Sequence, residues 1–408
     1  MAQQHQRLGC IILAGGQGSR LRPLTSHCAK PAVAFAGHYR VIDFVLSNCI
    51  NSGCDELWVL GQYQVDGLHH YLHQQWSKHR CPADIHIVKT RESKLKGTAG
   101  AVFQQLQQFE HSQATHLLVL SADHVYKMDF RQMLDFHLER EACMTIAAMP
   151  VPAELAPQFG VIAMDSQQRV TGFYEKPKPH QIRHLIDNNG MVLVSMGNYL
   201  FNRYCLFQSL QQDSKKILSR HDFGHDIIPA MYPKEPVYVY DFSSNLVPGE
   251  SQHYWRDVGT QDAFFQAHMD LLGPNPAVRL HNEHWPLFGK EPMPPSYFAG
   301  SDKSSIQDSL IGAGCELSAA SIRHSVIGSH CRIHQGAELE DCVLMGQVEV
   351  GANSKLRNVI VTENCRIAGH SSIGFNPRFD SQHYQRLPSG LVVVSSGQAG
   401  ISALNDLH

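Results

Sequence analysis

The chain has 408 residues, of which 43% are hydrophobic and 17% charged, and its formal net charge is −3. This length is too great for one small hydrophobic core, so we expect two domains. The near-neutral charge gives no electrostatic reason to expect nucleic acid or a membrane as partner. Without a signal-peptide core or an apolar run of about 20 residues, the sequence predicts a cytoplasmic protein.

The eleven cysteines are scattered and include no CxxC pair, which predicts reduced and mostly buried thiols. The 26 histidines are unusually many, and three of them crowd residues 69–73. Because neither HExxH nor a cysteine–histidine zinc pattern occurs, we expect surface or core histidines and no zinc site.

Near the N-terminus, an apolar run at residues 10–14 is typical of a buried parallel strand, and glycines follow it at positions 15, 16 and 18. Glycine lets backbone N–H groups approach an anion closely. Arg20 and Lys30 add the positive charge that a polyphosphate needs. The loop lacks the Walker A pattern, and Pro23 disfavours the immediate helix of a dinucleotide fold. An ordinary glycine-rich turn is the alternative.

The first 270 residues alternate apolar runs with helical patterns, which is typical of a mostly parallel sheet covered on both faces. Helices are expected at 41–52 and 130–141. Strands are expected at 10–14, 57–61, 85–89, 116–121, 143–149 and 236–241.

Asp123 follows the apolar strand at 116–121, at the sheet edge where ligands of open α/β sheets bind. A carboxylate there can hold Mg²⁺, although a helix N-cap is the alternative. Asp257, in YWRDVGT, would complete a two-carboxylate metal site or serve a structural role. From the residues alone, we infer a Mg²⁺-dependent enzyme that handles a nucleoside triphosphate.

Glu175 and Lys176 end another strand pattern, at 172–178. A lysine suits one phosphate and a carboxylate suits sugar hydroxyls. An exposed ion pair is the alternative for these two residues.

The segment 272–303 is rich in proline and reads as a linker between domains. Beyond it, aliphatic residues recur at gaps of five or six, as in the hexapeptide repeat of a parallel β-helix with about four coils. These positions are Ile311, Leu317, Ile322, Ile327, Ile333, Leu339, Leu344, Val350, Leu356, Val361, Ile367 and Ile373. The expected domains are therefore 1–271, the linker 272–303 and 304–408.

The opening loop, GGxGxRLxPLT…KP, resembles the signature of the sugar-nucleotide pyrophosphorylases. Taken with the motifs RVIDFVLSNCINSG, KGTAGAV, HDFGHDIIP and WRDVGT, the chain resembles the bacterial glucose-1-phosphate adenylyltransferases, or ADP-glucose pyrophosphorylases, over nearly its whole length. The resemblance implies a Rossmann-like nucleotidyltransferase domain followed by a left-handed parallel β-helix. It also implies that the enzyme makes ADP-glucose and pyrophosphate from ATP and glucose 1-phosphate, the committed step of bacterial glycogen synthesis.

The same resemblance implies the site residues. Arg20 and Lys30 would hold the β- and γ-phosphates, and Asp123 and Asp257 would hold Mg²⁺. The catalytic residues would be Arg20, Lys30 and Asp123. The nucleotide would meet Leu13, Gly15, Gly16, Gly18, Gln62, Gly97 and Thr98. Glucose 1-phosphate would meet Gly160, Glu175, Lys176, Ser195 and Asp222.

The chain departs from the family where Leu95, Lys96 and Gly100 replace an aromatic residue, an arginine and an aspartate. No phosphate or metal ligand is lost, so we expect catalysis to survive. The basic residues that take an activator's phosphates in bacterial relatives are replaced at His27 and Cys28, and Arg40 remains as a possible effector residue. We therefore expect weaker, absent or altered activation.

The resemblance also implies a homotetramer, with a paralogous subunit as a possible partner. Alternative functions are a regulatory or weakly catalytic subunit beside an active paralogue, a pyrophosphorylase that uses another nucleoside triphosphate, and an acyltransferase built on the β-helix. Four coils are few for an acyltransferase.

Overall fold

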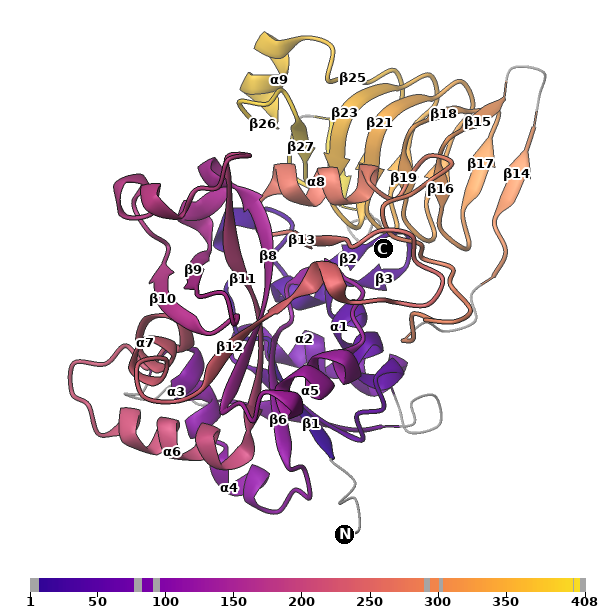
Figure 1. Ribbon diagram of the computed structural model, residues 1–408. Helices are drawn as coiled ribbons and strands as arrows, with labels where there is room; N and C mark the ends of the chain where they lie inside the picture. The colour runs from indigo at the N-terminus through magenta and orange to yellow at the C-terminus, as the bar shows by residue number, and fades with distance from the viewer. Residues whose placement is uncertain are drawn as a thin grey trace.

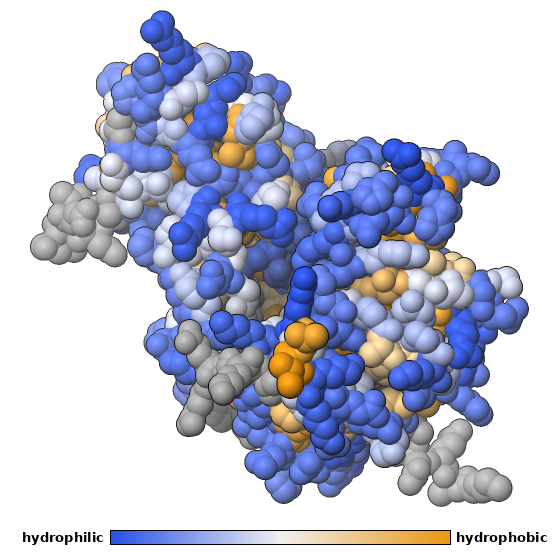
Figure 2. Space-filling view, turned by 90° about the vertical axis from the view of Figure 1, so that its left-hand side faces the viewer, coloured by the Kyte–Doolittle hydropathy of each residue, from blue (hydrophilic) through white to orange (hydrophobic). Residues whose placement is uncertain are grey.

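The computed structural model describes residues 7–76, 83–90, 96–289, 294–300, 304–398 and 400–403. It divides into an α/β part and a solenoid of short parallel strands, which lies at one end of the molecule (Figure 1). Within the described residues, no helix is long and apolar enough to span a membrane. The face drawn in Figure 2 is mostly hydrophilic, with its apolar residues in small groups.

A nine-stranded mixed sheet organises the α/β part. Its strands are β1 (Leu8–Leu13), β4 (Glu56–Gly61), β5 (Asp84–Lys89), β6 (His116–Ser121), β8 (Met144–Pro152), β9 (Gly160–Met164), β10 (Val170–Glu175), β11 (Met191–Asn202) and β12 (Val237–Asp241). The order is β10-β9-β11-β6-β1-β4-β5, with β8 beside β11 and β12 beside β8. The pairs β1–β4, β1–β6, β4–β5 and β8–β12 are parallel, whereas β11 runs antiparallel to its neighbours.

Helices cover both faces of this sheet (Figure 1). The described α-helices are α1 (Val41–Asn51), α2 (Val65–Gln75), α3 (Thr98–Phe103), α4 (Leu106–Glu110), α5 (Phe130–Glu139), α6 (Arg203–Ser214), α7 (Ile228–Met231), α8 (Gln261–Met269) and α9 (Pro377–His383). Successive residues of β1 enter opposite cores, Ile11 on one face and Ile12 on the other, because strand side chains alternate. The six expected strands and two expected helices are confirmed, with ends that differ by at most three residues.

Register places the loops of the site beside one another. Leu13, the last residue of β1, pairs with Ser121 at the end of β6 and with Leu60 near the end of β4. The carboxyl ends of these parallel strands therefore meet at one edge of the sheet, and the loops that follow them share that edge. A separate two-stranded ribbon, β7 (His124–Tyr126) with β13 (Trp255–Asp257), brings Asp257 opposite His124.

The solenoid is the expected left-handed parallel β-helix. Its strands are β14 (Tyr297–Ala299), β15 (Ser305–Gln307), β16 (Leu310–Ile311), β17 (Glu316–Ser318), β18 (Ser321–Arg323), β19 (Val326–Ile327), β20 (Arg332–Ile333), β21 (Glu338–Leu344), β22 (Glu349–Val350), β23 (Lys355–Val361), β24 (Cys365–Ile367), β25 (Ser372–Ile373), β26 (Gln385–Arg386), β27 (Val392–Val394) and β28 (Ile401–Ala403). Ser305 pairs with Ser321 and Ser321 with Glu338, so one coil takes 16 or 17 residues. Eleven of the twelve repeat positions are buried and Ile311 is half-buried, which confirms the hexapeptide prediction.

Apolar packing joins the two parts of the chain. Phe264 of α8 and Phe44 of α1 share a core cluster with Val343 and Ile360 of the β-helix. The proline-rich segment lies along α1, where Trp285 is buried and donates to Asn48 Oδ1 over 3.1 Å. Strand β14 lies within the range expected for the linker and pairs with β17, so one face of the solenoid extends into that range.

The expectation of reduced thiols is wrong for one pair. Cys143 and Cys205 form a disulfide with a Cα–Cα distance of 5.6 Å. They lie 62 residues apart in the sequence, and the tertiary fold alone brings the residue before β8 next to α6. The other described cysteines are free and, apart from the half-buried Cys28, buried. Cys81 lies outside the described residues.

Candidate active site

A cleft opens at the carboxyl ends of β1, β4 and β6. It collects eleven of the residues singled out from the sequence: Leu13, Gly15, Gly16, Gly18, Arg20, Lys30, Gln62, Gly97, Thr98, Asp123 and Asp222. They come from six segments of the chain. The parallel register brings together three of these segments, those that follow β1, β4 and β6 and carry the glycine loop, Gln62 and Asp123, because their strands are neighbours in the sheet.

The glycine loop follows β1 without a long helix, as Pro23 led us to expect. Gly18 has φ of +59°, and a Cβ there would lie 2.9 Å from the Thr25 side chain and 3.0 Å from that of Lys30. A side chain at this position would therefore crowd the lysine. Thr25 donates to the Gly18 carbonyl over 2.8 Å and fixes the turn. Lys30 follows in a short 3₁₀ turn, Lys30–Ala32, with its side chain buried.

Lys30 lies between the two carboxylates of the expected metal site. Its Nζ donates to Asp123 Oδ2 over 2.9 Å and to Asp257 Oδ1 over 3.0 Å. Burial disfavours the ammonium, but the two carboxylates outweigh this effect and raise the pKa of Lys30 above its usual value. Asp257 does not line the cleft itself, and it reaches the site through this contact.

Asp123 lies directly after β6 and before β7, so it does not cap a helix and that alternative is excluded. Burial alone would raise the pKa of this carboxyl. Lys30 and His124, together with a hydrogen bond from Ser121, instead hold its pKa well below the usual range. Asp123 is therefore a carboxylate at neutral pH, as a cation ligand must be.

Asp123, His124 and Asp257 form the group of described residues that could hold a metal ion, with one ligand atom from each within 4.8 Å of the others. The Nε2 atom of His124 lies 3.3 Å from Asp123 Oδ1 and 3.9 Å from Asp257 Oδ1, while its Nδ1 is buried without a partner. Sequence reasoning missed His124. The sequence places it next to Asp123, and this was the one feature that could have indicated a role for it at the site. Its position opposite Asp257 in the β7–β13 ribbon follows only from the tertiary structure.

Arg20 and Asp257 both lie close to Gly259. A Cβ on Gly259 would lie 2.9 Å from Asp257 Oδ1 and 3.0 Å from the Arg20 guanidinium. Gly259 lines the cleft and was not singled out from the sequence, nor were Ser19, Pro31, Leu60, Thr90, Ala101 and Ser121. These residues are apolar or small, and residues of these types do not by themselves indicate a ligand site.

A second group of expected residues adjoins the cleft through Asp222. A Cβ on Gly224 would lie 2.4 Å from Glu175 Oε2, and one on Gly160 would lie 2.9 Å from the same atom. Asp222 caps the π turn at Phe223–Ile227 by accepting from the amides of Gly224 and His225. Burial would raise the pKa of Asp222, but hydrogen bonds from His225 and Thr98 lower it.

Three of the residues expected from the sequence do not line the cleft: Lys176, Ser195 and Arg40. Lys176 has φ of +46°, and its largely exposed side chain pairs with Glu175 Oε1 at 3.3 Å, which is the arrangement expected for a strand-end ion pair. Ser195 accepts from the Gly197 amide over 3.1 Å. Arg40 does not line the cleft and pairs with Glu363 of the β-helix at 3.0 Å.

Two family models match this chain. The model of the nucleotidyl transferase family covers residues 10–273, and the GlmU-like, C-terminal hexapeptide model covers residues 294–394. These ranges correspond to the α/β part and the β-helix, respectively.

Curated relatives resemble the chain along almost its full length. It is 41% identical over 400 residues to "Glucose-1-phosphate adenylyltransferase 1" of Vibrio parahaemolyticus, which covers 95% of this chain and 97% of the relative. Identity is 40% to "Glucose-1-phosphate adenylyltransferase" of Aliivibrio fischeri, over 95% of this chain and 98% of the relative. Identity is 38% to "Glucose-1-phosphate adenylyltransferase" of Corynebacterium jeikeium, over 94% of this chain and 96% of the relative. The chain therefore belongs to the nucleotidyl transferase family and, within it, to the glucose-1-phosphate adenylyltransferases.

Proposed function

We propose that this chain transfers the adenylyl group of ATP to glucose 1-phosphate and that Mg²⁺ is its metal. A phosphate oxygen of glucose 1-phosphate forms a bond to the α-phosphorus of ATP. The bond from that phosphorus to the oxygen bridging to the β-phosphorus breaks, and pyrophosphate leaves. The products are ADP-glucose and pyrophosphate. The observation that carries this proposal is the convergence of Arg20, Lys30 and Asp123 on one cleft, with Asp257 paired to Lys30 beside it.

The two carboxylates suit Mg²⁺, which takes oxygen ligands and keeps substrate phosphates in its coordination shell. Their geometry supports this assignment, since a cation (the Lys30 ammonium) already lies between Asp123 and Asp257. When bound, the metal supplies positive charge against the phosphates of ATP. His124 is the third group close enough to contribute a ligand atom.

The remaining residues bind and orient the substrates. Backbone amides of Gly15, Gly16 and Gly18 lie where a triphosphate would enter, and Arg20 and Lys30 neutralise its charge. Leu13, Gln62, Gly97 and Thr98 line the same cleft and are assigned to the nucleotide. Little covalent chemistry is required of the protein in such a displacement, so orientation and charge stabilisation account for most of the rate.

The glucose 1-phosphate site is assigned to the group around Asp222. Glu175 packs against Gly160 and Gly224 and is mostly buried, which suits a carboxylate that accepts from sugar hydroxyls. The Lys176 side chain is largely exposed, so its ammonium is accessible to a phosphate. Ser195 completes this set.

The test is pyrophosphate release by the purified chain alone, with ATP, UTP or dTTP and with glucose 1-phosphate or galactose 1-phosphate. We expect ATP with glucose 1-phosphate to give the highest kcat/KM. Preference for another triphosphate would support a different pyrophosphorylase. Release that requires an added paralogue would support the alternative of a regulatory subunit.

We also propose a cytoplasmic homotetramer. Tyr297 and Phe298 are exposed on β14, which forms the edge of its sheet, and edge strands of this kind favour association. Light scattering of the purified chain measures the mass of the assembly directly, and a monomeric mass would contradict this proposal.

A further inference from the structure

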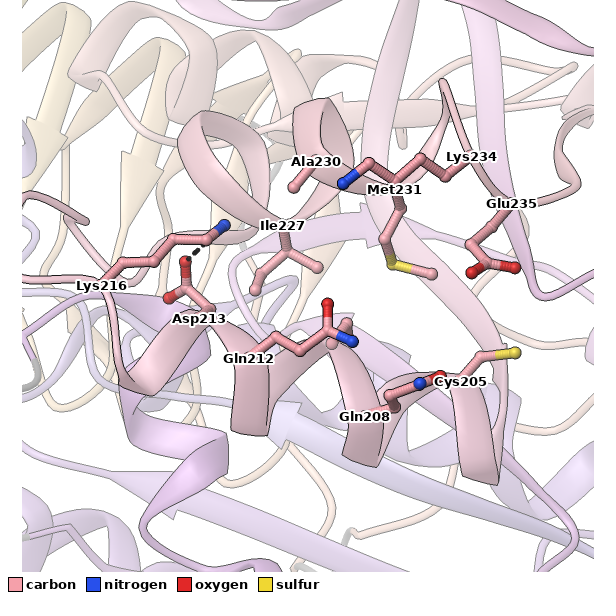
Figure 3. A pocket seen from close by; sticks show the side chains of 11 residues that line it. Cys205, Gln208, Gln212, Asp213, Lys216, Ile227, Ala230, Met231, Lys234 and Glu235 are labelled. Atoms are coloured by element: carbon pink, nitrogen blue, oxygen red, sulfur yellow. Dashed lines mark ion pairs between the residues drawn. The ribbon is translucent and has the colours of Figure 1, made fainter.

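A buried carboxylate outside the cleft contacts a loop that adjoins the site. Asp213 lies at the end of α6 and is 3% exposed. It accepts from Ser219 Oγ over 2.8 Å and lies 2.8 Å from His221 Nδ1, which must carry the hydrogen because a carboxylate only accepts. Figure 3 shows Asp213 paired with Lys216 beside a pocket between α6 and α7.

His221 has a backbone conformation that needs support. Its φ of +54° lies in the left-handed region, which is unfavourable for a residue with a side chain. The imidazole is held by Asp213, and the peptide of His221 is consequently fixed in direction. The His221 carbonyl accepts from the Gly100 amide over 3.0 Å, in the first turn of α3.

The loop at 219–222 packs directly on the turn that begins α3. A Cβ on Gly97 would lie 2.5 Å from the carbonyl oxygens of both Arg220 and His221, so the two backbones are in contact and leave no room for a side chain. Displacing the His221 carbonyl would therefore displace Gly97 as well.

The same two segments meet inside the cleft. Thr98 Oγ1 donates to Asp222 Oδ2 over 2.9 Å and accepts from the Phe223 amide over 3.1 Å. Gly97 and Thr98 are assigned to the nucleotide and Asp222 to the sugar. The loop held by Asp213 thus joins the two halves of the substrate site.

We propose that Asp213 and His221 are positioning residues of the adenylyl transfer reaction. Neither lines the cleft. Asp213 fixes His221, and His221 sets the Gly97–Thr98 turn and Asp222 at the spacing that both substrates require. This inference rests on the proposed function, because it concerns how the substrates of that reaction are held.

The test compares Asp213→Ala with the conservative Asp213→Asn and with Asn202→Ala as control. Asn202 caps the opposite end of α6 by accepting from the Tyr204 amide over 2.9 Å, so its loss weakens the same helix without touching the loop at 219–222. We expect Asp213→Ala to raise KM for ATP and for glucose 1-phosphate about tenfold, with kcat within about threefold of wild type. Asp213→Asn retains an acceptor for His221 and should restore both KM values to within about threefold.

A second readout does not depend on turnover. The Gly100 amide should exchange with deuterium about tenfold faster in Asp213→Ala, because its acceptor on His221 is released, and at the wild-type rate in Asn202→Ala. Unchanged KM values and unchanged exchange in Asp213→Ala would overturn the inference, as would equal KM increases in Asn202→Ala. Absence of activity in the wild type would contradict the proposed function instead, and exchange at Gly100 would then decide whether Asp213 holds the loop.

Discussion

Lys30 and Asp123, 93 residues apart in the sequence, form a hydrogen-bonded ion pair of 2.9 Å at the carboxyl edge of the sheet. The lysine is buried, and each partner stabilises the charge of the other. The Lys30 ammonium also pairs with Asp257, so this one group connects three segments of the chain.

Asp123→Asn should reduce pyrophosphate release about a hundredfold or more, because it removes a charged group from the position where phosphate and metal charges meet. Binding of Mn²⁺, measured by electron paramagnetic resonance, should weaken in parallel. Asp55→Asn is the control, since Asp55 is an exposed aspartate that precedes β4 at the opposite edge of the sheet. Equal activity of Asp123→Asn and wild type would refute the assignment of Asp123.

Acid should destabilise the protein through His268. This buried side chain accepts from the Ala36 amide over 3.1 Å at Nε2 and lies 2.8 Å from the Phe264 carbonyl at Nδ1, so it must be neutral. Burial lowers the pKa of His268 to about 4, below the value of about 6.5 for an unfolded chain. Its stabilising contribution is therefore complete above pH 6.5 and decreases as the pH falls from 6.5 to 4, by about 3 kcal/mol in total.

The measurement for His268 is the free energy of unfolding in urea between pH 4 and pH 8, for wild type and for His268→Gln. Glutamine can accept from the Ala36 amide without titrating, so its curve should be flatter. His137, whose pKa burial lowers to about 3, acts in the same direction in both proteins and cancels from the difference. Parallel curves would show that His268 does not carry this pH dependence.

Fructose 1,6-bisphosphate should change the KM for ATP by less than about twofold. Arg40, the remaining basic residue of the region, is engaged by Glu363 at 3.0 Å and lies over the Tyr71 ring at 5.6 Å. Burial, together with Glu363, raises the pKa of Cys28 to about 11, so this neighbouring thiol is uncharged at neutral pH. Initial rates with and without the bisphosphate test the expectation, and a large rise in apparent affinity for ATP would contradict it.

In the same assay, Glu363→Gln releases Arg40 from its carboxylate. We expect this variant to respond to the bisphosphate more strongly than wild type, because a freed guanidinium can pair with phosphate. An identical response in both proteins would show that the Arg40–Glu363 pair does not limit activation.

Ile322→Ala should lower the free energy of unfolding by about 3 kcal/mol, since it opens a cavity inside the solenoid. Ile306 is the matched control. The two residues pair across adjacent coils, but Ile322 is fully buried whereas Ile306 is 42% exposed. Ile306→Ala should cost less than about 1 kcal/mol. Equal losses in urea unfolding would contradict the register of the first two coils.

Much of the fold was predictable because its patterns are local and repeated. The strand before the glycine loop, the helix at 130–139 and the hexapeptide positions from Leu317 to Ile373 are periodic in the sequence, and their burial follows from that period. The disulfide of Cys143 with Cys205 was not predictable in this way. It joins residues 62 apart, and no spacing rule for cysteines covers that distance.

The sequence by itself determined which residue types were available: a glycine loop with two cations, one carboxylate after an apolar run and another in YWRDVGT, and aliphatic residues at gaps of five or six. Only the tertiary structure decided which of them meet. It placed Lys30 between Asp123 and Asp257, added His124 through the β7–β13 ribbon, and turned Arg40 away toward Glu363. The physical reason is that hydrogen bonds and ion pairs act over about 3 Å, a distance set by strand order and register rather than by separation along the chain.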